Sequence, residues 1–279
     1  MDALPPDLQR AVRALAAQPR ALVALDFDGC LAPIVADPQD ARPLPEASDA
    51  LRRLAATPGT TVALVSGRPL DALRQLAAPP AAALLVGSHG AEFGGGALGS
   101  TESLPRAEGL DGGAPRLGPQ ARHLLDRVTA ALQGIVRDHP GAALELKPTS
   151  AVLHTRRAER AEAAAATAAA LAGPAGWPGV HVLQGKEVVE ISVSDATKGA
   201  ALRRLREVAL ADGEGGVLYA GDDVTDERAF AVLDDDAGDV TVKVGDGETL
   251  ARHRVPDPVA VARLLQFLLE LRAAEVRSG

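Results

Sequence analysis

The chain has 279 residues, 47% of them hydrophobic, so it is long and apolar enough to bury one large core or two moderate ones. Its net charge of −8 at pH 7 argues against a nucleic-acid-binding surface and against adhesion to anionic membranes, and leaves room for a basic pocket that binds one anion. Aromatic residues make up only 2% of the chain, which argues against a base-stacking platform, and the single cysteine, Cys30, excludes an internal disulfide.

The first predicted elements lead to an acidic pair. Residues 6–18 fit an amphipathic helix, and the apolar run 22–25 has the length of a strand buried on both faces of a parallel sheet. The run stops at Asp26 and Asp28, at the carboxyl end where open α/β sheets bind ligands. Because an unpaired carboxylate at the edge of a core is costly, a divalent cation is the expected partner. The alternative is that both aspartates only start a turn and cap the next segment.

The next elements repeat this pattern. Helices and strands alternate over residues 45–56, 60–65, 70–76 and 83–87. The first of these strands ends at Ser66, Gly67 and Arg68, which place a hydroxyl, backbone N–H groups and a cation beside a helix start. That is a good site for a phosphate oxygen, although an ordinary helix N-terminus has the same residues. The second strand ends near His89, which either lines the same edge or is a satisfied histidine near the core.

The regular alternation of predicted helices and strands ends after the third strand. Residues 94–118 are rich in Gly, Ser and Pro and are predicted to form a loop or hinge. Helices are then predicted at 120–136 and 158–172, and strands at 143–147, 151–155, 180–183 and 187–191. Two αββ units in succession describe a small antiparallel α+β module that is distinct from the parallel half.

From residue 194 onward, single predicted helices and strands alternate again, as in the first part of the chain. Lys198 opens a helix that runs to residue 210, and strand 216–220 ends at the acidic run GDDVTDE. The remaining predicted elements are a helix at 227–233, a strand at 240–244 and a helix at 258–271. The predicted fold class is therefore α/β, a doubly wound parallel sheet with an inserted α+β domain. The expected boundaries are residues 1–110 and 194–279 for the core and residues 111–193 for the insert.

The acidic run supplies the second half of the predicted site. The cluster GDDVTD within it has three carboxylates, those of Asp222, Asp223 and Asp226. Such a cluster at the end of a buried strand repels itself, so it needs a cation, and with Asp26 and Asp28 it offers hard oxygen ligands that suit Mg²⁺. Lys198 supplies a positive charge near the same edge that could keep a carboxylate ionised. The alternative for the run is a solvated loop with a cap for the next helix.

The order of these motifs resembles a known family. A DxDG motif, a strand-end Ser, a Lys that opens a helix and a GDDxxD motif are similar in order to the haloacid dehalogenase superfamily of phosphohydrolases. The closer resemblance is to trehalose-6-phosphate phosphatases, and it covers residues 22–244. It rests on DFDGCLAPI, LVSGRP, VGSHGAE, ELKPTSAVLHTR, KEVVEI, TKGAAL and GDDVTDE. The inserted module then corresponds to the family's cap domain.

The resemblance implies roles for the core residues. Asp26 is expected to be the nucleophile that forms an aspartyl-phosphate, and Asp28 the acid that protonates the leaving sugar oxygen and then the base that activates water. Mg²⁺ is expected to be held by Asp26, the backbone carbonyl of Asp28, and Asp222. Ser66 is expected to donate to a phosphate oxygen, and Lys198 to neutralise the nucleophile and the phosphate. Supporting roles fall to Asp223 and Asp226.

The resemblance also implies substrate contacts. Arg68 and His89 are expected at the phosphate end, and the cap residues Glu145, Lys147 and Glu190 match positions that bond sugar hydroxyls in similar enzymes. The alternative for the three cap residues is a solvated strand face. One departure is Cys30, which stands where the superfamily usually has Thr. If that position acts through its backbone the change matters little, whereas a lost hydroxyl bond to Asp28 lowers activity.

Three alternatives to trehalose 6-phosphate hydrolysis are considered. The first is hydrolysis of another sugar phosphate, such as sucrose phosphate or a glycosylglycerate phosphate. The second, a phosphoaspartate receiver, is disfavoured because receivers lack an aspartate two residues after the phosphate acceptor and have no cap. The third is a catalytically silent sugar-phosphate sensor that binds a synthase, and the retention of Asp26 and Asp28 argues against it.

The expected partners and location follow from the same observations. A small-molecule sugar phosphate is the expected ligand, with no nucleic acid and no membrane, and a trehalose-phosphate synthase is a candidate associate. The N-terminal segment MDALPPDLQRAV is acidic and Pro-containing, and no run reaches about 18 apolar residues, so neither a signal peptide nor a membrane span is expected. Together with the cysteine content, this favours the cytoplasm.

Overall fold

The computed structural model describes residues 4–95, 117–194, 196–211 and 214–278 of the chain. It separates into two compact units, one made of Met1–Gly113 and Ala196–Gly279 and the other of Ala114–Asp195. The predicted boundary after residue 110 and most of the loop predicted at 94–118 lie outside the described residues. The predicted domain boundaries therefore stay predictions.

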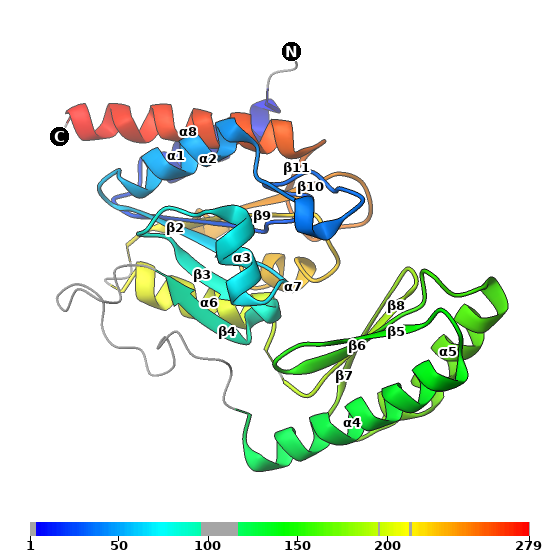
Figure 1. The fold of residues 1–279 in the computed structure, drawn as a ribbon. Helices are drawn as coiled ribbons and strands as arrows, with labels where there is room; N and C mark the ends of the chain where they lie inside the picture. Colours follow the sequence, from blue (N-terminus) through cyan, green and yellow to red (C-terminus); the bar gives the residue numbers. More distant parts are fainter. Residues whose placement is uncertain (1–3, 96–116, 195, 212–213, 279) are drawn as a thin grey trace. The chain divides into compact units, whose positions relative to one another are not determined.

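The first unit is built on one mostly parallel sheet. Within the described residues its strand order is β11-β10-β9-β1-β2-β3-β4 (Figure 1). The strands are β1 (Ala21–Leu25), β2 (Thr60–Val65), β3 (Leu84–Gly87), β4 (Glu92–Gly95), β9 (Gly216–Gly221), β10 (Val240–Val244) and β11 (His253–Val255). All neighbouring pairs are parallel except β3 with β4, which is antiparallel. Strands of this kind need crossovers, and helices supply most of them.

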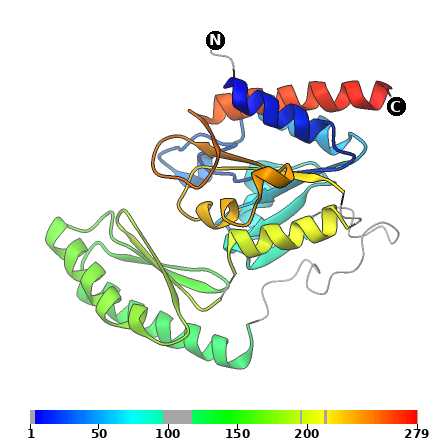
Figure 2. The same ribbon diagram turned by 180° about the vertical axis from the view of Figure 1, so that it is seen from behind.

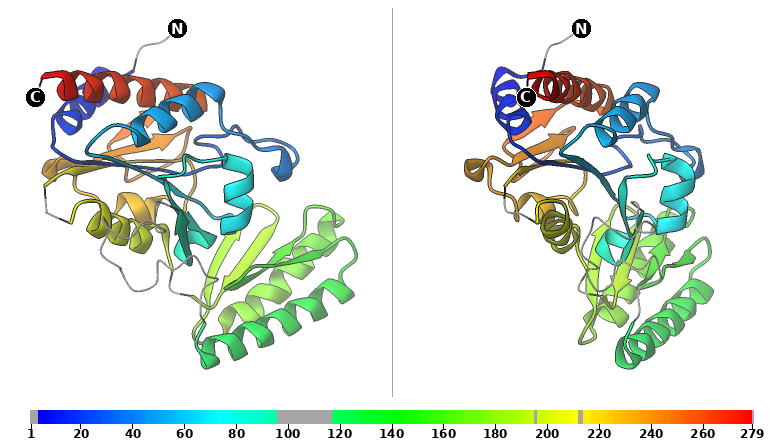
Figure 3. Two further views of the ribbon diagram at one scale, coloured as in Figure 1. Left: turned by 60° about the vertical axis from the view of Figure 1, so that its left-hand side comes forward. Right: turned by 90° about the vertical axis from the view of Figure 1, so that its left-hand side faces the viewer.

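Helices cover both faces of this sheet. They are α1 (Pro6–Ala16), α2 (Pro45–Ala55), α3 (Leu70–Ala77), α6 (Lys198–Ala209), α7 (Glu227–Phe230) and α8 (Pro258–Ser278), with short 3₁₀ turns η1 (Pro38–Asp40), η2 (Ser88–Gly90) and η4 (Asp235–Ala237). Val23 and Leu25 of β1 pack in one apolar cluster with α1, α2, α3 and α8, whereas Leu22 and Ala24 pack in the other with α6 and α7. Figures 2 and 3 show the sheet between these helical layers. The predicted doubly wound α/β core is confirmed.

Four elements of the core differ from the prediction. Strand β4 was not predicted because its sequence is half glycine, and β11 because it is only three residues long. Helix α7 ends at Phe230 rather than at residue 233. Helix α8 extends past residue 271 to Ser278, and buried Arg272 in this extension donates to the carbonyl oxygens of Ala16 and Pro58 at 3.2 Å each.

The second unit is an antiparallel sheet covered by two helices. Its strand order is β5-β6-β8-β7, and all neighbouring pairs are antiparallel. The elements are α4 (Pro119–Asp138), β5 (Ala143–Leu146), β6 (Ser150–His154), α5 (Arg160–Ala172), η3 (Pro174–Gly176), β7 (His181–Gly185) and β8 (Val188–Ser192). Leu153 and Ile191 pack with Val128 of α4 and Ala166 of α5 in the core of this unit. The predicted α+β module is confirmed, and alternate residues of its strands lie on the sheet face away from α4 and α5.

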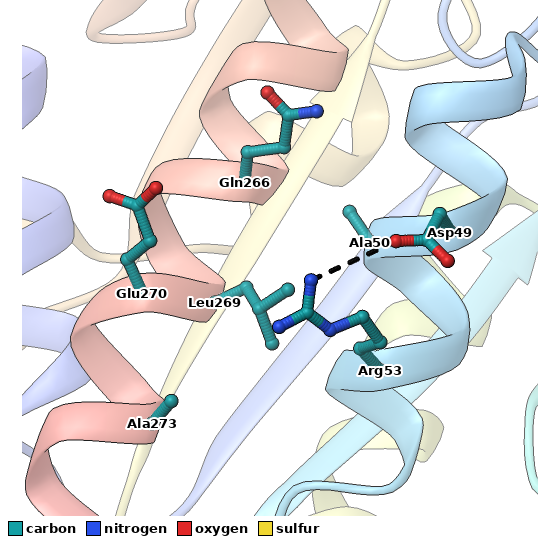
Figure 4. A pocket seen from close by; sticks show the side chains of 7 residues that line it. All are labelled: Asp49, Ala50, Arg53, Gln266, Leu269, Glu270 and Ala273. Carbon is teal, nitrogen blue, oxygen red and sulfur yellow. Dashed lines mark ion pairs between the residues drawn. The ribbon is translucent and has the colours of Figure 1, made fainter.

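A groove of about 380 Å³ lies between α2 and α8 on the first unit (Figure 4). Its lining residues are Asp49, Ala50, Arg53, Gln266, Leu269, Glu270 and Ala273. The Arg53 guanidinium is 3.8 Å from Asp49 on the same helix, which is the i,i+4 pairing of an ordinary helix surface. None of the predicted site residues lines this groove. No helix among the described residues is long and apolar enough to cross a membrane.

Candidate active site

The predicted core residues lie where neighbouring parallel strands end. Asp26 follows β1, Ser66 follows β2 and Asp222 follows β9, and these three strands are adjacent in the sheet. The ladder continues one residue past two of the strands, because Asp26 N donates to Ala220 O and Ser66 N donates to the strand β3 carbonyl of Val86, both at 2.9 Å. The carboxyl ends of parallel strands meet at one edge, so the structure brings these side chains to the same edge.

A buried lysine stands between two buried carboxylates. Lys198 Nζ is 3.0 Å from Asp26 Oδ1 and 2.8 Å from Asp226 Oδ1. Asp26, Lys198 and Asp226 are 4%, 2% and 0% exposed. Burial lowers the pKa of Lys198, but the attraction of Asp26 and Asp226 outweighs burial and raises the pKa above its ordinary value. Burial raises the pKa of Asp26 well above its usual range, and Lys198 opposes that shift.

Asp226 is held by further donors. Tyr219 Oη donates to its Oδ1 at 2.6 Å, and the backbone N–H of Asp223 donates to its Oδ2 at 2.9 Å. Both carboxylate oxygens are therefore used within the protein, and Asp226 orients Lys198. Tyr219 was not among the predicted site residues. The signal was present, because a buried tyrosine in an apolar strand needs a partner for its hydroxyl, and this is the single tyrosine of the chain.

The acidic edge has the donors that a hard cation requires. Oxygen atoms of Asp26, Asp222 and Asp226 lie within 4.8 Å of one another. Burial and the Asp226 charge raise the pKa of Asp222 to about 6, so the ionised cluster is unstable without a positive charge. Gly29 adopts a φ of +70°, and a Cβ at this position would lie 2.0 Å from Asp222 Oδ2. The glycine thus leaves room for this carboxylate, and the residues present fit a Mg²⁺ site.

Lys243 also supports this edge and was not predicted from the sequence. It lies in β10, is 4% exposed, and its ammonium group donates to the backbone carbonyl oxygen of Asp222. A lysine inside the otherwise apolar strand VTVKV was the available signal, because a buried ammonium group needs an acceptor. The contact fixes the backbone that carries Asp222.

Arg68 bonds Asp28. Its Nε donates to Asp28 Oδ2 and its Nη2 donates to Oδ1, both at 2.6 Å. The guanidinium also lies 5.4 Å from the centre of the Phe27 ring. The sequence analysis placed Arg68 at the phosphate end, and that role stays a prediction. The structure adds a direct partner that the sequence did not indicate, because the two residues are 40 positions apart.

The loop after β2 is tied to the turn after β3. Arg68 N donates to Ser66 Oγ at 3.2 Å, Ser88 N donates to Arg68 O at 2.8 Å, and His89 N donates to Ser66 O at 3.0 Å. Ser88 and His89 have positive φ values of 49° and 56°, which L-residues adopt at a cost. Buried Glu92 holds the two segments together, since its Oε2 accepts from Ser88 Oγ at 2.5 Å and from the α3 N–H of Leu70 at 3.1 Å.

His89 and Cys30 occupy defined places in this edge. A Cβ on Gly67 would lie 2.4 Å from His89 Cε1, so the imidazole packs directly on the loop between Ser66 and Arg68. Cys30 is fully buried, and its thiol donates to the carbonyl oxygen of Ala220 at 3.4 Å. Burial raises the pKa of this thiol well above its ordinary value, and the charge of Asp26 adds to the shift.

The predicted sugar contacts gather on the second unit. Glu145 and Glu190 both pair with Val152 across neighbouring strands, on the sheet face away from α4 and α5. Lys147 Nζ donates to Glu190 Oε2 at 2.8 Å. Ser150 Oγ donates to Glu190 Oε1 at 2.6 Å, and His154 Nε2 pairs with Glu145 Oε2 at 2.7 Å, two contacts that the sequence analysis did not predict.

Comparisons with known proteins agree with this geometry. The family model for trehalose-phosphatase matches residues 24–259. The trehalose-6-phosphate phosphatase of Escherichia coli K12 is 33% identical over 91% of the chain and 89% of that protein. A bifunctional trehalose-6-phosphate synthase/phosphatase of Thermoproteus tenax is 34% identical over 89% of the chain, which spans 32% of that longer protein. The C-terminal domain of Candida albicans trehalose-6-phosphate phosphatase has the same fold, with a TM-score of 0.75 at 23% identity, covering 96% of the chain and 99% of that domain.

Proposed function

The chain belongs to the trehalose-phosphatase family of phosphoric monoester hydrolases, with a haloacid dehalogenase-type core and a cap, and we propose that it hydrolyses trehalose 6-phosphate to trehalose and phosphate with Mg²⁺. The observation that carries the proposal is the buried edge at which Asp26, Lys198 and Asp222 converge. Its biological role is the last step of trehalose biosynthesis. The relatives named above supply the sugar, and the core geometry supplies the chemistry.

The chemistry proceeds on Asp26. One of its carboxylate oxygens attacks phosphorus in line with the sugar oxygen, so the Asp26–phosphorus bond forms as the bond to the sugar oxygen breaks. Asp28 gives its proton to the departing sugar oxygen. Water then attacks the aspartyl-phosphate, Asp28 takes the proton from that water, and Asp26 is regenerated with release of phosphate.

The other core residues hold charge in place. Lys198, 3.0 Å from Asp26, favours the ionised form of the nucleophile and offsets the charge of the phosphoryl group. Ser66 donates its hydroxyl to a phosphate oxygen, while Asp226 and Asp223 position Lys198 and the acidic loop. Asp26, Asp222 and the carbonyl of Asp28 would hold Mg²⁺, which would supply charge neutralisation for the phosphoryl group.

The cap supplies the sugar contacts in this proposal. Glu145, Lys147 and Glu190 accept from and donate to the hydroxyls of trehalose. Glu190 is held in position by Lys147 and Ser150, and Glu145 by His154. Because each of these carboxylate oxygens retains a further lone pair, they can accept a sugar hydroxyl without losing their protein partners.

Association with a trehalose-phosphate synthase is part of the proposal. Its support is the Thermoproteus tenax relative, in which a synthase and a phosphatase share one chain. A cytoplasmic location is also proposed, and the single buried cysteine, Cys30, is compatible with that reducing compartment.

A kinetic panel tests the substrate. With Mg²⁺ present, kcat/KM for trehalose 6-phosphate is expected to exceed that for sucrose 6-phosphate and for a glycosylglycerate phosphate by about a hundredfold, which corresponds to about two polar contacts. A faster rate on either competitor assigns the enzyme to that sugar instead. Asp26→Asn is expected to remove turnover and the acid-stable phosphate label on the protein, and retained turnover would favour the non-catalytic sensor.

A further inference from the structure

Arg68 and Asp28 are expected to contact different parts of the substrate, but in the structure they form hydrogen bonds with each other. Arg68 is expected to face the phosphate and Asp28 the leaving sugar oxygen, yet the Arg68 guanidinium bridges both oxygens of Asp28 at 2.6 Å. Such a fork-to-fork pair is planar and strong, because both hydrogen bonds join opposite charges. In this arrangement both Asp28 oxygens are directed at Arg68, so neither is presented to a leaving group.

The pair is supported on several sides. The Arg68 side chain is 13% exposed and lies over the buried ring of Phe27, at 5.4 Å from its centre. The Arg68 backbone is fixed at both ends, since its N–H donates to Ser66 Oγ at 3.2 Å and its carbonyl accepts from Ser88 N at 2.8 Å. Phe27 precedes Asp28 directly, so one segment carries both the ring and the carboxylate. The contact is thus held in place on the Arg68 side, while the Asp28 side chain is 35% exposed and remains accessible to solvent.

The proposed reaction requires this pair to open. Because Asp28 is ionised in this pair, it must take up a proton from water once Arg68 leaves it, and then turn the protonated oxygen toward the sugar oxygen to give that proton away. It must later turn an oxygen toward the attacking water to take a proton. A phosphate monoester offers more acceptor oxygens and more negative charge to a guanidinium than one carboxylate does. The phosphate is expected beside Ser66, whose hydroxyl already accepts from the N–H of Arg68.

We infer that Arg68 is a positioning residue that exchanges partners: it holds Asp28 away from the reaction in the ligand-free enzyme and moves to the phosphate when a substrate arrives. The exchange couples phosphate recognition to the release of the acid and base group. Asp28 is then turned to the reacting atoms only when a phosphate is in place. This inference rests on the proposed phosphatase function, and its central test involves no sugar.

The test is a binding cycle with inorganic phosphate in the presence of Mg²⁺, measured by calorimetry on wild type, Asp28→Asn, Arg68→Ala and the double variant. Asp28→Asn weakens the competitor for Arg68, so phosphate is expected to bind about tenfold more tightly. In the Arg68→Ala background the same Asp28→Asn change is expected to leave phosphate affinity within about twofold. An equal gain in both backgrounds would show that Asp28 acts only by charge repulsion and would overturn the inference, as would the absence of any gain.

A second test covers the case in which Arg68→Ala does not fold. Arg68→Lys keeps the charge but cannot bridge both Asp28 oxygens. In the Arg68→Lys background, Asp28→Asn is expected to tighten phosphate binding by less than about threefold, because the competition that it relieves is weaker there. A full tenfold gain in this background would show that the bridging contact does not compete with phosphate and would overturn the inference.

The matched control is Arg74→Ala, which removes an exposed arginine of α3, the helix that follows Arg68, whose partner, Asp71, is 3.2 Å away. This variant is expected to change neither phosphate affinity nor the gain in affinity that Asp28→Asn gives. If trehalose 6-phosphate is not hydrolysed but the phosphate cycle gives the expected coupling, the sugar assignment fails and the partner exchange stands. If trehalose 6-phosphate is hydrolysed and the coupling is absent, the reverse holds.

Discussion

The core edge and the cap face carry two halves of the predicted site in contrasting environments. Asp26, Lys198 and Asp226 are almost completely buried, and each charge has a partner of opposite sign. On the cap, the side chains of Glu145 and His154 are 46% and 43% exposed. Charges in the core edge therefore interact strongly with one another, whereas water weakens the pair of Glu145 with His154. The second cap pair, Lys147 with Glu190, is intermediate, since both side chains are 12% exposed. This difference in burial suits the core edge to the phosphoryl-transfer chemistry and the cap face to recognition of the sugar.

The largest effects on stability and turnover are expected from a substitution in the buried edge of the core. Asp226→Ala removes the shared acceptor of Lys198 and Tyr219 and leaves both donors buried without it. The free energy of unfolding is expected to fall by about 3–5 kcal/mol, and turnover is expected to be lost because Lys198 is no longer oriented. Chemical denaturation and a phosphate-release assay measure the two losses.

A second buried aspartate separates stability from catalysis. Asp239 accepts from Arg206 at 2.5 Å and from Val217 N at 2.9 Å, and it belongs to none of the site contacts described above. Asp239→Ala is expected to lower stability comparably while the folded fraction keeps its kcat. If Asp226→Ala kept its turnover per folded molecule, the assignment of Asp226 to the orientation of Lys198 would be wrong.

The second prediction concerns pH and Mg²⁺ at the same edge. The pKa of Asp222 is raised to about 6 in the folded protein from an ordinary value of 3.8, so the folded state binds more protons than the unfolded state between these values. The metal-free protein therefore loses stability as pH rises toward and through about 6, and Mg²⁺ offsets this loss only when Asp222 is ionised. Saturating Mg²⁺ is expected to stabilise by about 2.7 kcal/mol at a hundredfold excess over Kd above pH 6, and by much less near pH 5.

Thermal unfolding with and without Mg²⁺ across this pH range measures the effect. Asp222→Asn is the control, because it removes one titrating ligand, and it is expected to reduce the pH-dependent part of the Mg²⁺ stabilisation, leaving the part that comes from Asp26. A Mg²⁺ effect that stayed constant from pH 5 to 8 would exclude Asp222 as the group that links proton and metal binding.

The third prediction acts on the cap. Glu190→Gln replaces an anionic acceptor with a neutral one, so KM for trehalose 6-phosphate is expected to rise about tenfold with a smaller change in kcat. Activity on 4-nitrophenyl phosphate, which has no sugar, is expected to stay within about twofold. Glu187→Gln, an exposed carboxylate in the turn between β7 and β8, is the matched control and is expected to leave both substrates unaffected.

The contrast between the two regions also explains what the sequence could predict. The positions of Asp26, Ser66 and Asp222 at one edge follow from a general rule, since the carboxyl ends of parallel strands lie together. The contact between Arg68 and Asp28 follows no such rule, because it depends on side-chain conformations across 40 residues of chain. Individual roles of the site residues stay predictions until variants are measured.

Other site residues could not be predicted, because their sequence context lacks the usual signals of strands and sites. Glu92 is a buried carboxylate whose strand, β4, is half glycine and carries little strand propensity. On the cap, Ser150 and His154 look like ordinary strand residues, and their function as partners of Glu190 and Glu145 becomes visible only when the strand register is known. The spacing of apolar residues, every second residue in strands and about every 3.6 residues in helices, predicted where the elements lie. Which side chains contact one another depends on how the strands pair, and the spacing does not give that pairing.

The smallest effect is expected from a substitution of Cys30, which also lies in the core edge. It tests whether every position of that edge is equally sensitive to substitution. Cys30 stands where the family resemblance led us to expect Thr, and its thiol donates to the Ala220 carbonyl at 3.4 Å, a weak bond to the backbone of β9. Cys30→Ser keeps the shape and offers a stronger donor to the same carbonyl, so stability is expected to change by less than about 1 kcal/mol and kcat/KM by less than about threefold. Cys30→Val adds volume at a fully buried site and is expected to cost about 1–3 kcal/mol, which shows that the assay detects changes at this position. A large gain in kcat/KM for Cys30→Ser would instead mean that a hydroxyl acts on the reacting groups, and that the departure at Cys30 limits the rate.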